Sequence, residues 1–313
     1  MQPSWTGRTD GTTPEHLRWH QVVRPYGPGV EPGACVFVGF ASDEGVRRNK
    51  GRVGAAAGPD ALRQALAPMA LAQPHLAYDA GTVTVRDGRL EEGQRALGAT
   101  VTGVLDAGHF PVVLGGGHEI AYGTYLGVAG SRRATAAGRI GILNLDAHFD
   151  LRADAVPSSG TPFRQILEAD GDIVRYAVLG ISQPSNTTAL FDTAAKYNVR
   201  YLLDDDCEQE RALAFVDDFV ADIDLLYLTI DLDVLPAAVA PGVSAPAAFG
   251  IPLSTIQAVC DRVTACGKLA VVDVAELNPG LDIDNRTART AARLIHRIVT
   301  GHVPSRPAGD HQK

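Results

Sequence analysis

The sequence predicts an α/β fold in which helices cover a central parallel sheet. Its strands are expected in six short runs that are continuously apolar, the pattern of strands buried on both faces rather than on one. In chain order the runs are ACVFVGF (34–40), HFPVVLGGG (109–117), RIGILNLDAH (139–148), VRYAVLGIS (174–182), DLLYLTIDLDV (224–234) and KLAVVDVAEL (268–277).

Helices are expected between these runs, because the connecting stretches carry apolar residues at helical spacing and end near Gly, Pro or Asn. The clearest are GPDALRQALAPM (58–69), LEEGQRALGATVTGVLDAG (90–108), SNTTALFDTAAKYN (185–198) and IPLSTIQAVCDRVTACG (251–267). Strands and helices alternate along one repeating system, and no linker divides it. In sheets of this kind, ligands bind beyond the carboxyl ends of the strands, where functional residues are therefore expected.

Composition excludes several classes of function. The chain has 313 residues, a formal net charge of −8 and 45% hydrophobic residues, so it is large enough to bury a core and is not a general binder of nucleic acid or membrane surfaces. No apolar run is long enough to span a membrane, and the polar opening does not resemble a secretory signal, so we expect a cytoplasmic protein. The cysteines lack metal-site spacing and are expected to be reduced structural residues; they are Cys35, Cys207, Cys260 and Cys266.

The first group of chemically active residues follows the strand expected at 139–148. In NLDAHFDLR, Asp146, His148 and Asp150 recur at every second position, so an extended backbone would direct all three to one side. Buried carboxylates placed side by side are unfavourable because desolvation and mutual repulsion add, and a divalent cation is the usual compensation. The alternative is a strand end that dips into solvent with surface Asp and His side chains.

A second carboxylate pair ends another apolar run. In LTIDLDVLPAAVAPG, Asp231 and Asp233 are two residues apart, and the alternatives are a helix cap or a surface calcium-like site. His118 follows three glycines in VVLGGGHEIA, where the small residues allow close approach of the backbone. A phosphate loop is less favoured for this run, since the lysine and hydroxyl residue that usually end such loops are missing. Together the groups supply six ligands, which suit two cations that share carboxylates.

Three motifs carry a resemblance to the ureohydrolases, a family that includes arginases, agmatinases and formimidoylglutamases. They are GGGHE, LDAHFDLR and TIDLDVLPAAVAPG, the last followed by Gly250, and they occur in the family's order. The resemblance implies a three-layer α/β/α fold with a central parallel sheet. It also implies two manganese ions per chain and hydrolysis at an amidine or guanidine carbon.

The same resemblance assigns the metal ligands. One manganese would be held by His118, Asp146, Asp150 and Asp231. The other would be held by Asp146, His148, Asp231 and Asp233, so that Asp146 and Asp231 bridge the pair. Two adjacent cations lower the pKa of a bridging water enough to supply hydroxide near neutral pH.

The loop after the second motif indicates the branch of the family. Arginases and agmatinases carry a histidine there, whereas this chain reads AVPSSGTPFRQI, with no histidine between Phe149 and Arg175. The segment SGTPFRQI resembles the formimidoylglutamases, as do DEGVRRNKGRVGAAAGPDALR (43–63) and VAPGVSAPAA (239–248). The expected reaction is cleavage of N-formimidoyl-L-glutamate to L-glutamate and formamide, a step of histidine degradation. The alternatives are a guanidino-acid or agmatine ureohydrolase that releases urea, and a noncatalytic metal-binding relative.

A glutamate-derived substrate brings two carboxylates, which guanidinium groups bind in bidentate fashion. We expect Arg164 to grip one of them, with Arg47, Arg48 and Arg52 as further candidates.

Asp150 and Glu276 are the expected catalytic residues. Glu276 matches the glutamate that bonds amidine nitrogens in the family, and Asp273 is a candidate for orienting a ligand histidine or an arginine. The family also implies a homo-oligomer, either a trimer or a hexamer, with a small-molecule substrate. The expected organisation is a loosely ordered segment over 1–30, a ureohydrolase domain over 31–301 and a flexible tail over 302–313.

Overall fold

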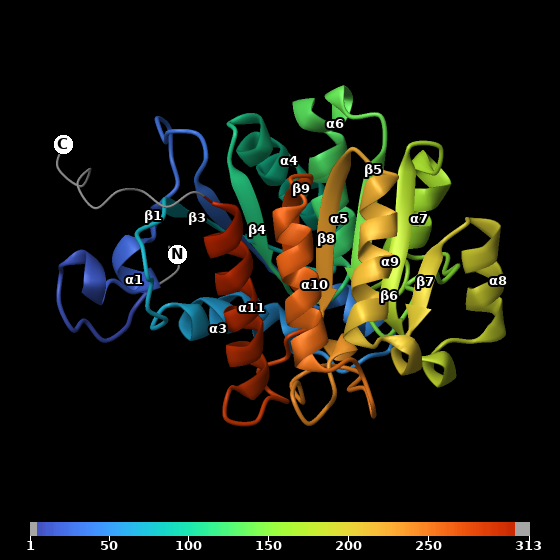
Figure 1. The fold of residues 1–313 in the computed structure, drawn as a ribbon. Coiled ribbons are helices and arrows are strands. Elements are labelled where there is room, and N and C mark those ends of the chain that lie inside the picture. Colours follow the sequence, from blue (N-terminus) through green and yellow to red (C-terminus); the bar gives the residue numbers. More distant parts are fainter. Residues whose placement is uncertain (1–4, 304–313) are drawn as a thin grey trace.

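The computed structural model describes residues 5–303, which form one sheet of nine parallel strands between two layers of helices (Figure 1). The strands lie in the order β1-β3-β2-β4-β9-β8-β5-β6-β7. Their bounds are β1 Arg24–Pro25, β2 Cys35–Ala41, β3 Ala77–Thr84, β4 Phe110–Leu114, β5 Ile140–Leu145, β6 Val174–Ile181, β7 Arg200–Leu203, β8 Leu225–Asp231 and β9 Leu269–Ala275. The predicted three-layer α/β/α fold with a central parallel sheet is confirmed.

Two sets of helices cover the two faces of the sheet. One face is covered by α3, α9, α10 and α11, and the other by α4, α5, α6 and α7 (Figure 1). The helix bounds are α1 Trp19–Val22, α2 Glu44–Arg48, α3 Gly58–Leu66, α4 Leu90–Asp106, α5 Ile120–Ala129, α6 Arg132–Ala136, α7 Pro162–Asp170, α8 Thr188–Lys196, α9 Gln209–Ala221, α10 Leu253–Ala265 and α11 Arg286–His302. None of these helices is long and apolar enough to cross a bilayer.

All six predicted strands are confirmed, and the three that the sequence did not reveal lie at the edges of the sheet or next to one. They are the edge strands β1 and β7 and, beside β1, the strand β3, which pairs with both β1 and β2 and is only partly buried. An edge strand has one hydrogen-bonding side free and is less completely buried, so its sequence lacks a continuous apolar run. Strand β7 shows this most clearly, because Arg200 and Tyr201 are both exposed.

The four predicted helices are present, but the sequence did not predict α5, α7, α9 and α11, each of which is longer than two turns. Helix α5 is apolar on all sides, so its sequence lacks the amphipathic spacing that identifies a helix. Helix α7 lies in a segment that the sequence predicts as a loop. Pro162 is the first residue of this helix. Pro at the first helical position is favourable, because the missing N–H would have no partner there. Helices α9 and α11 complete the layer that contains α3 and α10.

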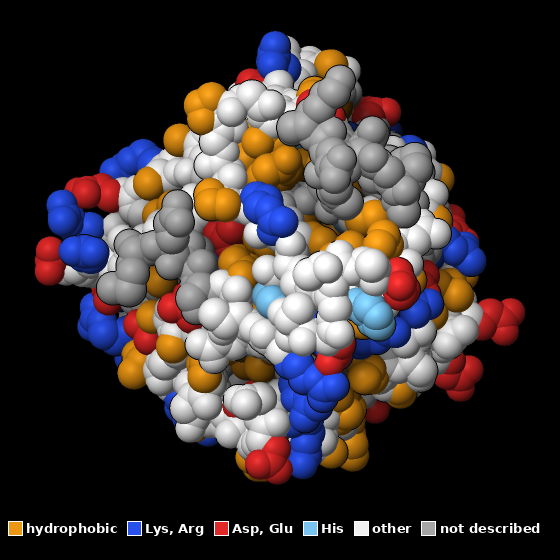
Figure 2. Space-filling view, turned by 90° about the vertical axis from the view of Figure 1, so that its left-hand side faces the viewer, with side chains coloured by type: hydrophobic (Ala, Val, Ile, Leu, Met, Phe, Trp, Pro, Cys, Tyr) orange, Lys and Arg blue, Asp and Glu red, His pale blue; other side chains and the backbone are white. Residues whose placement is uncertain are grey.

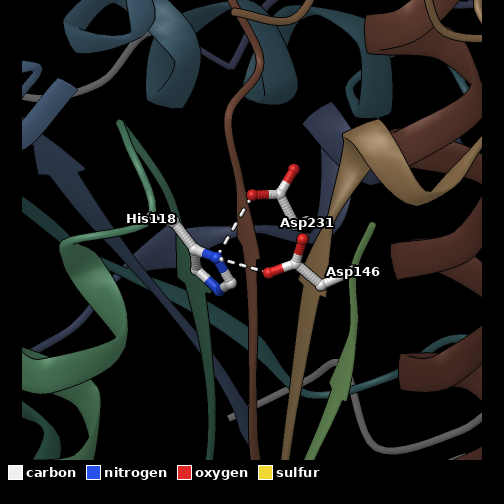
Figure 3. A group of neighbouring side chains, drawn as sticks. All are labelled: His118, Asp146 and Asp231. Atoms are coloured by element: carbon white, nitrogen blue, oxygen red, sulfur yellow. Dashed lines mark ion pairs between the residues drawn. The ribbon is translucent and has the colours of Figure 1, made fainter. Parts of the chain in front are cut away.

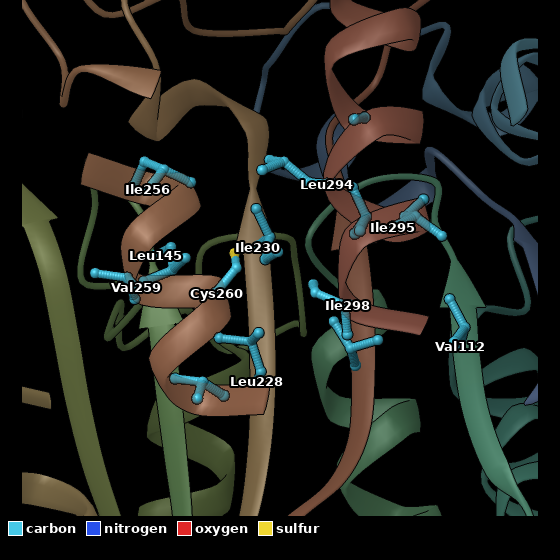
Figure 4. Packing of buried hydrophobic residues seen from close by; sticks show 14 of the residues in the cluster. Val112, Leu145, Leu228, Ile230, Ile256, Val259, Cys260, Leu294, Ile295 and Ile298 are labelled. Atoms are coloured by element: carbon cyan, nitrogen blue, oxygen red, sulfur yellow. The ribbon is translucent and has the colours of Figure 1, made fainter. Parts of the chain in front are cut away.

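The core beneath α10 and α11 consists of aliphatic side chains that meet across the helix–sheet interface. Ile256, Val259 and Cys260 of α10 lie in one cluster with Leu145 of β5 and with Leu228 and Ile230 of β8, and all six are fully buried (Figure 4). Each fully buried side chain of this size contributes about 1.5 to 3 kcal/mol to folding, so this layer holds the central strands firmly. The site described below stands on those strands.

The N-terminal residues that the structure describes pack against the β1 edge. Trp19 of α1 is completely buried, and its indole Nε1 donates to His296 Nδ1 of α11 at 3.0 Å. Trp5 also packs in this region, and its indole Nε1 donates to Asp79 of β3 at 2.8 Å. On the face at this edge, basic, acidic and hydrophobic side chains are intermixed (Figure 2). The predicted tail over 302–313 lies outside the described residues except for its first two positions.

Candidate metal centre

Four neighbouring strands of the sheet end at the candidate site. They are β4, β9, β8 and β5, and because all are parallel their carboxyl ends meet at one edge. His118 follows β4, Glu276 follows β9, Asp231 ends β8, and Asp146 follows β5. The fold therefore gathers residues that are more than 150 positions apart in the sequence, such as His118 and Glu276, whose separation is 158 residues.

The imidazole of His118 lies against three carboxylates. Its Nδ1 is 3.1 Å from Asp146 Oδ2, 2.9 Å from Asp150 Oδ2 and 3.2 Å from Asp231 Oδ2. Figure 3 shows His118, Asp146 and Asp231 pointing toward one another from three different elements. These four residues are the ones that the sequence assigned to the first manganese.

A second group adjoins the first. His148 Nδ1 is 3.5 Å from Asp146 Oδ1 and 3.1 Å from Asp233 Oδ2. Asp146 thus offers one oxygen to each group, the arrangement expected of a carboxylate that bridges two cations. Asp231, the other predicted bridge, contacts the His118 group in the described structure.

The two carboxylate motifs share a local turn. The backbone N–H of His148 donates to Asp146 Oδ1 at 2.7 Å, and that of Asp233 donates to Asp231 Oδ1 at 2.9 Å. Strand β5 ends at Leu145, so the expectation that an extended backbone aims Asp146, His148 and Asp150 to one side is wrong. Their convergence comes from this turn and from the left-handed backbone of Asp150, at φ 49°.

The electrostatics of the described chain fit a pair of cations. Burial, followed by the nearby Asp233 and Asp146 carboxylates, raises the pKa of Asp231 well above its usual range. Burial likewise raises the pKa of Asp150 and of Asp233. His118 Nδ1 is buried and donates to no acceptor with good hydrogen-bond geometry. Clustered buried carboxylates with two imidazole nitrogens are a donor set for hard to borderline divalent cations such as manganese, which compensate the negative charge.

The hydroxyl group of Thr229 orients His118. Its Nε2 lies 3.0 Å from Thr229 Oγ1, which leaves Nδ1 directed at the carboxylates. Asp273 is the register partner of Thr229 across β8 and β9, and its buried carboxylate accepts from the hydroxyl of Tyr227. Asp273 therefore lies beside the residue that contacts the predicted ligand histidine.

The three glycines before His118 provide room for neighbouring backbone. A Cβ at Gly115 would lie 2.3 Å from Val274 O, and one at Gly116 would lie 1.9 Å from Ser42 O. The run is hydrogen-bonded on both sides, because Gly115 N donates to Val274 O at 2.8 Å and Gly117 N donates to Ser42 O at 3.0 Å. The glycines thus allow the His118 turn to sit between β9 and the segment after β2.

Glu276 is held over the same centre. Its Oε1 accepts the backbone N–H of His118 at 2.8 Å, while its buried Oε2 has no hydrogen-bond partner among the described residues. Burial, together with the neighbouring Glu119 carboxylate, raises the pKa of Glu276 to about 8. The backbone of Glu276 is left-handed, with φ 68°, so two acidic residues of the site, Asp150 and Glu276, adopt a conformation that side chains disfavour.

These residues line a cavity of about 320 Å³. Five of the six predicted metal ligands line it, and we use floor for these five together with the adjoining Asp146: His118, Asp146, His148, Asp150, Asp231 and Asp233. We use mouth for the polar residues around its opening, which are Asn49, Lys50, Arg52, Arg152, Ser159, Ser185, Asn186 and Ser244. Asn186 also braces the floor, because its Oδ1 accepts from Phe149 N at 3.1 Å and its Nδ2 donates to Ala147 O at 2.9 Å.

The structure brings only one of the four predicted arginines to this cavity. Arg52 lines it, with its guanidinium donating to the carbonyls of Ser244 at 2.8 Å and Val243 at 2.7 Å. Arg164 lies in the first turn of α7 and pairs with Glu168, one turn later, at 2.8 Å.

Arg47 and Arg48 belong to α2, where both pair with Glu44. Arg48 also contacts Glu91 at 2.6 Å. These guanidinium groups lie outside the cavity because acidic residues of the same or a neighbouring helix hold them.

Two positively charged side chains at the mouth were not predicted from the sequence. Arg152 and Lys50 line the cavity, are exposed, and form no side-chain hydrogen bond or ion pair within residues 5–303. Arg152 is fixed through its backbone, whose N–H donates to Gly160 O at 2.9 Å. The signal that could have revealed Arg152 is its place in the second motif, two residues after Asp150.

Comparisons with known proteins agree with this geometry. The model of the arginase family matches residues 33–301. A formimidoylglutamase from Nocardia farcinica is 82% identical over 307 residues, which cover 98% of this chain and 99% of that protein.

Two solved structures have the same fold. Formiminoglutamase from Trypanosoma cruzi with Mn²⁺ has a TM-score of 0.81 and 27% identity, covering 93% of this chain and 99% of that one. Formimidoylglutamase from Bacillus subtilis has a TM-score of 0.83 and 22% identity, covering 96% of this chain and 97% of that one. At this low identity the likeness shows the fold alone. From the family match and the identity to its relatives, this chain belongs to the arginase family.

Proposed function

We propose that this chain is a formimidoylglutamase, a binuclear manganese hydrolase that converts N-formimidoyl-L-glutamate and water to L-glutamate and formamide. The observation that carries the proposal is the floor of the cavity, where two histidine–carboxylate groups share Asp146. The identity of 82% to a formimidoylglutamase supports this substrate over others in the family.

The floor residues would hold the two ions, His118, Asp146, Asp150 and Asp231 on one side and Asp146, His148, Asp231 and Asp233 on the other. When bound, such a pair supplies Lewis acidity that makes water a nucleophile near neutral pH. In the reaction a water oxygen bonds to the formimidoyl carbon, the bond from that carbon to the glutamate nitrogen breaks, and the nitrogen takes up a proton as it leaves.

Glu276 is suited to hold the formimidoyl group. Its Oε1 is fixed by the N–H of His118, and its Oε2 is free to accept from a cationic amidine nitrogen. A charge-assisted hydrogen bond of this kind is stronger than a neutral one and has a defined direction. Glu276 would thus orient the formimidoyl carbon toward the floor.

The glutamate part of the substrate carries two carboxylates, and the mouth offers two positively charged side chains that have no partner among residues 5–303. Arg152 and Lys50 have the charge and the exposure that carboxylate binding requires. Arg152 therefore takes the role that the sequence suggested for Arg164, whose guanidinium is paired with Glu168. Arg52 would support them from the same side of the opening.

A product assay tests the proposal. The manganese-loaded enzyme should release formamide from formimidoylglutamate and little or no urea from agmatine, arginine or guanidinobutyrate. The expected preference rests on the two carboxylates of the substrate and on the segment 155–166, which has no histidine. Urea release from a guanidino compound at a higher kcat/KM than formamide release would overturn it.

The remaining expectations about the molecule are part of the same proposal. Residues 31–301 constitute the catalytic domain, and the enzyme works as a homo-oligomer, a trimer or a hexamer, in the cytoplasm. A reducing compartment is consistent with the four cysteines, all of which are free thiols.

A further inference from the structure

Glu119, the last residue of the GGGHE motif, has been described so far only as the carboxylate beside Glu276. Its side chain is completely buried at the start of α5, directly after His118. A buried carboxylate costs free energy unless hydrogen bonds compensate it. The groups that donate to Glu119 therefore show what it holds in place.

Both donors belong to the segment that follows β2. Glu119 Oε1 accepts from Ser42 Oγ at 2.7 Å and from the backbone N–H of Gly45 at 2.9 Å. The carbonyl of Ser42 in turn accepts the N–H of Gly117 at 3.0 Å. The His118 turn and the segment 42–52 are thus joined by side-chain and backbone hydrogen bonds in a dry environment.

The glycines on both sides are fitted to this carboxylate. A Cβ at Gly45 would lie 2.5 Å from Glu119 Cδ, and a Cβ at Gly117 would lie 2.2 Å from Glu119 Oε2. Real Cβ atoms essentially never come so close to another heavy atom. The last glycine of the run therefore makes room for Glu119, in addition to the room the others give to the backbone of β9 and Ser42.

The segment held by Glu119 carries one side of the mouth. It passes through α2 and ends with Asn49, Lys50 and Arg52, all of which line the cavity. Its far end is fixed separately, since Gly54 N donates to Asp43 Oδ2 at 2.7 Å and Arg52 bonds the carbonyl of Ser244. Glu119 is the link between this segment and the turn that bears a metal ligand.

We infer that Glu119 is a positioning residue: it fixes the segment 42–52 against the His118 turn and so sets the distance between the substrate-binding mouth and the metal centre. The inference rests on the proposed function for the identity of the substrate. Glu119 touches neither substrate nor metal, so its loss should act on substrate binding and on the mobility of the segment.

The first variant is Glu119→Ala, studied with the full manganese-loaded enzyme. We expect KM for formimidoylglutamate to rise about tenfold or more, kcat to change less than KM even though Glu119 neighbours Glu276, and metal content to be unchanged. Amide hydrogen exchange over residues 43–52 should accelerate by about tenfold, with or without substrate. Glu119→Gln keeps an acceptor at Oε1 and should restore both measurements to within about threefold of the parent.

Two further variants guard against an uninformative loss of folding. Ser42→Ala removes one donor and leaves the Gly45 bond, so a smaller rise in KM and in exchange over 43–52 is expected. Gln94→Ala is the matched control. Gln94 belongs to α4, and its Nε2 donates to the backbone carbonyl of Glu119 at 2.8 Å, so the variant removes a contact of Glu119 that does not involve the segment 42–52. It should lower the melting temperature and leave KM and the local exchange unchanged.

The outcomes separate the inference from the proposed function. Unchanged KM and unchanged exchange over 43–52 in both Glu119→Ala and Ser42→Ala would overturn the inference, as would an equal rise in KM for Gln94→Ala. Loss of bound metal in folded Glu119→Ala would also overturn it, since Glu119 would then act through His118. If the parent enzyme does not hydrolyse formimidoylglutamate, the proposed function fails, while the exchange measurement still decides whether Glu119 holds the segment.

Discussion

The floor and the mouth of the cavity are both rich in charge, and they neutralise it in different ways. On the floor, buried carboxylates face one another and two imidazoles, so that the charge balance needs cations from outside the chain. Beside the mouth, arginines that do not line the cavity are neutralised by the protein itself, as Arg48 is by Glu44 and Glu91 and Arg164 is by Glu168. Arg152 and Lys50, which do line it, have no such partner among residues 5–303.

This difference teaches which charges mark a ligand. A charge without a partner from the chain identifies a site on the floor and at the mouth alike, whereas a charge that is merely close to the site does not. Exposed ion pairs such as Arg164 with Glu168 contribute little to stability, about 0 to 1 kcal/mol. They nevertheless occupy the guanidinium and direct it away from the cavity.

The largest effect is expected from the carboxylate that belongs to both halves of the floor. Asp146→Ala should lose both manganese ions and reduce kcat by about a thousandfold or more, because each group uses one oxygen of Asp146. Asp233→Ala should lose one ion, since Asp233 contacts only the His148 group. Metal analysis of the purified variants makes the comparison. Retention of one ion by Asp146→Ala would contradict a shared ligand.

A second variant tests the carboxylate above the floor. Glu276→Gln keeps the shape of the side chain and can still accept the His118 N–H, but it loses the charge that binds a cationic amidine. We expect intact metal content and a loss of about 30- to 1000-fold in kcat, equivalent to roughly 2 to 4 kcal/mol. Steady-state kinetics with parallel metal analysis measure this. Parental kinetics with intact metal would remove Glu276 from the reaction.

The mouth is tested by comparing two arginines. Arg152→Ala should lower kcat/KM for formimidoylglutamate by about 30-fold or more, chiefly through KM, because an unpaired guanidinium that binds a carboxylate is lost. Arg164→Ala removes a guanidinium that is already paired with Glu168 and should change kcat/KM by less than about threefold. Arg152→Lys should lie between them, since lysine lacks the planar fork. The reverse order would restore Arg164 as the carboxylate-binding residue.

The smallest effect expected is a change in stability with pH after chelation. In the metal-free chain the pKa of Glu276 is raised to about 8 from 4.5, and burial raises the pKa of Asp150, Asp231 and Asp233. A group with a raised pKa binds protons more tightly when folded, so its contribution is complete below the unfolded pKa and is lost as pH rises through the folded one.

Although burial opposes it, contact with carboxylates raises the pKa of His118 and His148, which therefore act in the same direction. The melting temperature of chelated protein should fall by several degrees between about pH 5 and pH 8, and the gain on adding manganese should grow over the same range. Calorimetry of both forms tests this. A chelated protein whose melting temperature rises with pH would contradict it.

The sequence predicted the floor well because its signal is local. Carboxylates at alternate positions after an apolar run mark a strand end, and parallel strands bring their carboxyl ends together whatever their separation in the chain. The detailed backbone at Asp150 was not predictable in this way, because a left-handed residue there follows from the turn at Asp146 and from support by Asn186.

The mouth was less predictable because the state of an arginine depends on side chains outside its own motif. Nothing near Arg48 in the sequence indicates Glu91, which comes from α4, and nothing near Lys50 indicates that it has no partner in the part of the chain that the structure describes. Strand β3 was missed for a related reason, since part of its surroundings comes from Trp5, which bonds Asp79 of that strand. The position and burial of a central strand can be predicted from its own sequence, whereas the partners of long side chains depend on the assembled fold.

The left-handed backbone of Asp150 has a consequence for directed evolution of this enzyme. Asn tolerates that conformation better than most residues, and Asp150→Asn also removes one negative charge from a crowded floor. A selection for thermal resistance of the metal-free protein would therefore enrich Asn at position 150, at the expense of metal binding and turnover. Libraries that are screened for heat tolerance alone should accumulate folded but inactive variants with a substitution at position 150. A turnover assay in every round would retain Asp150.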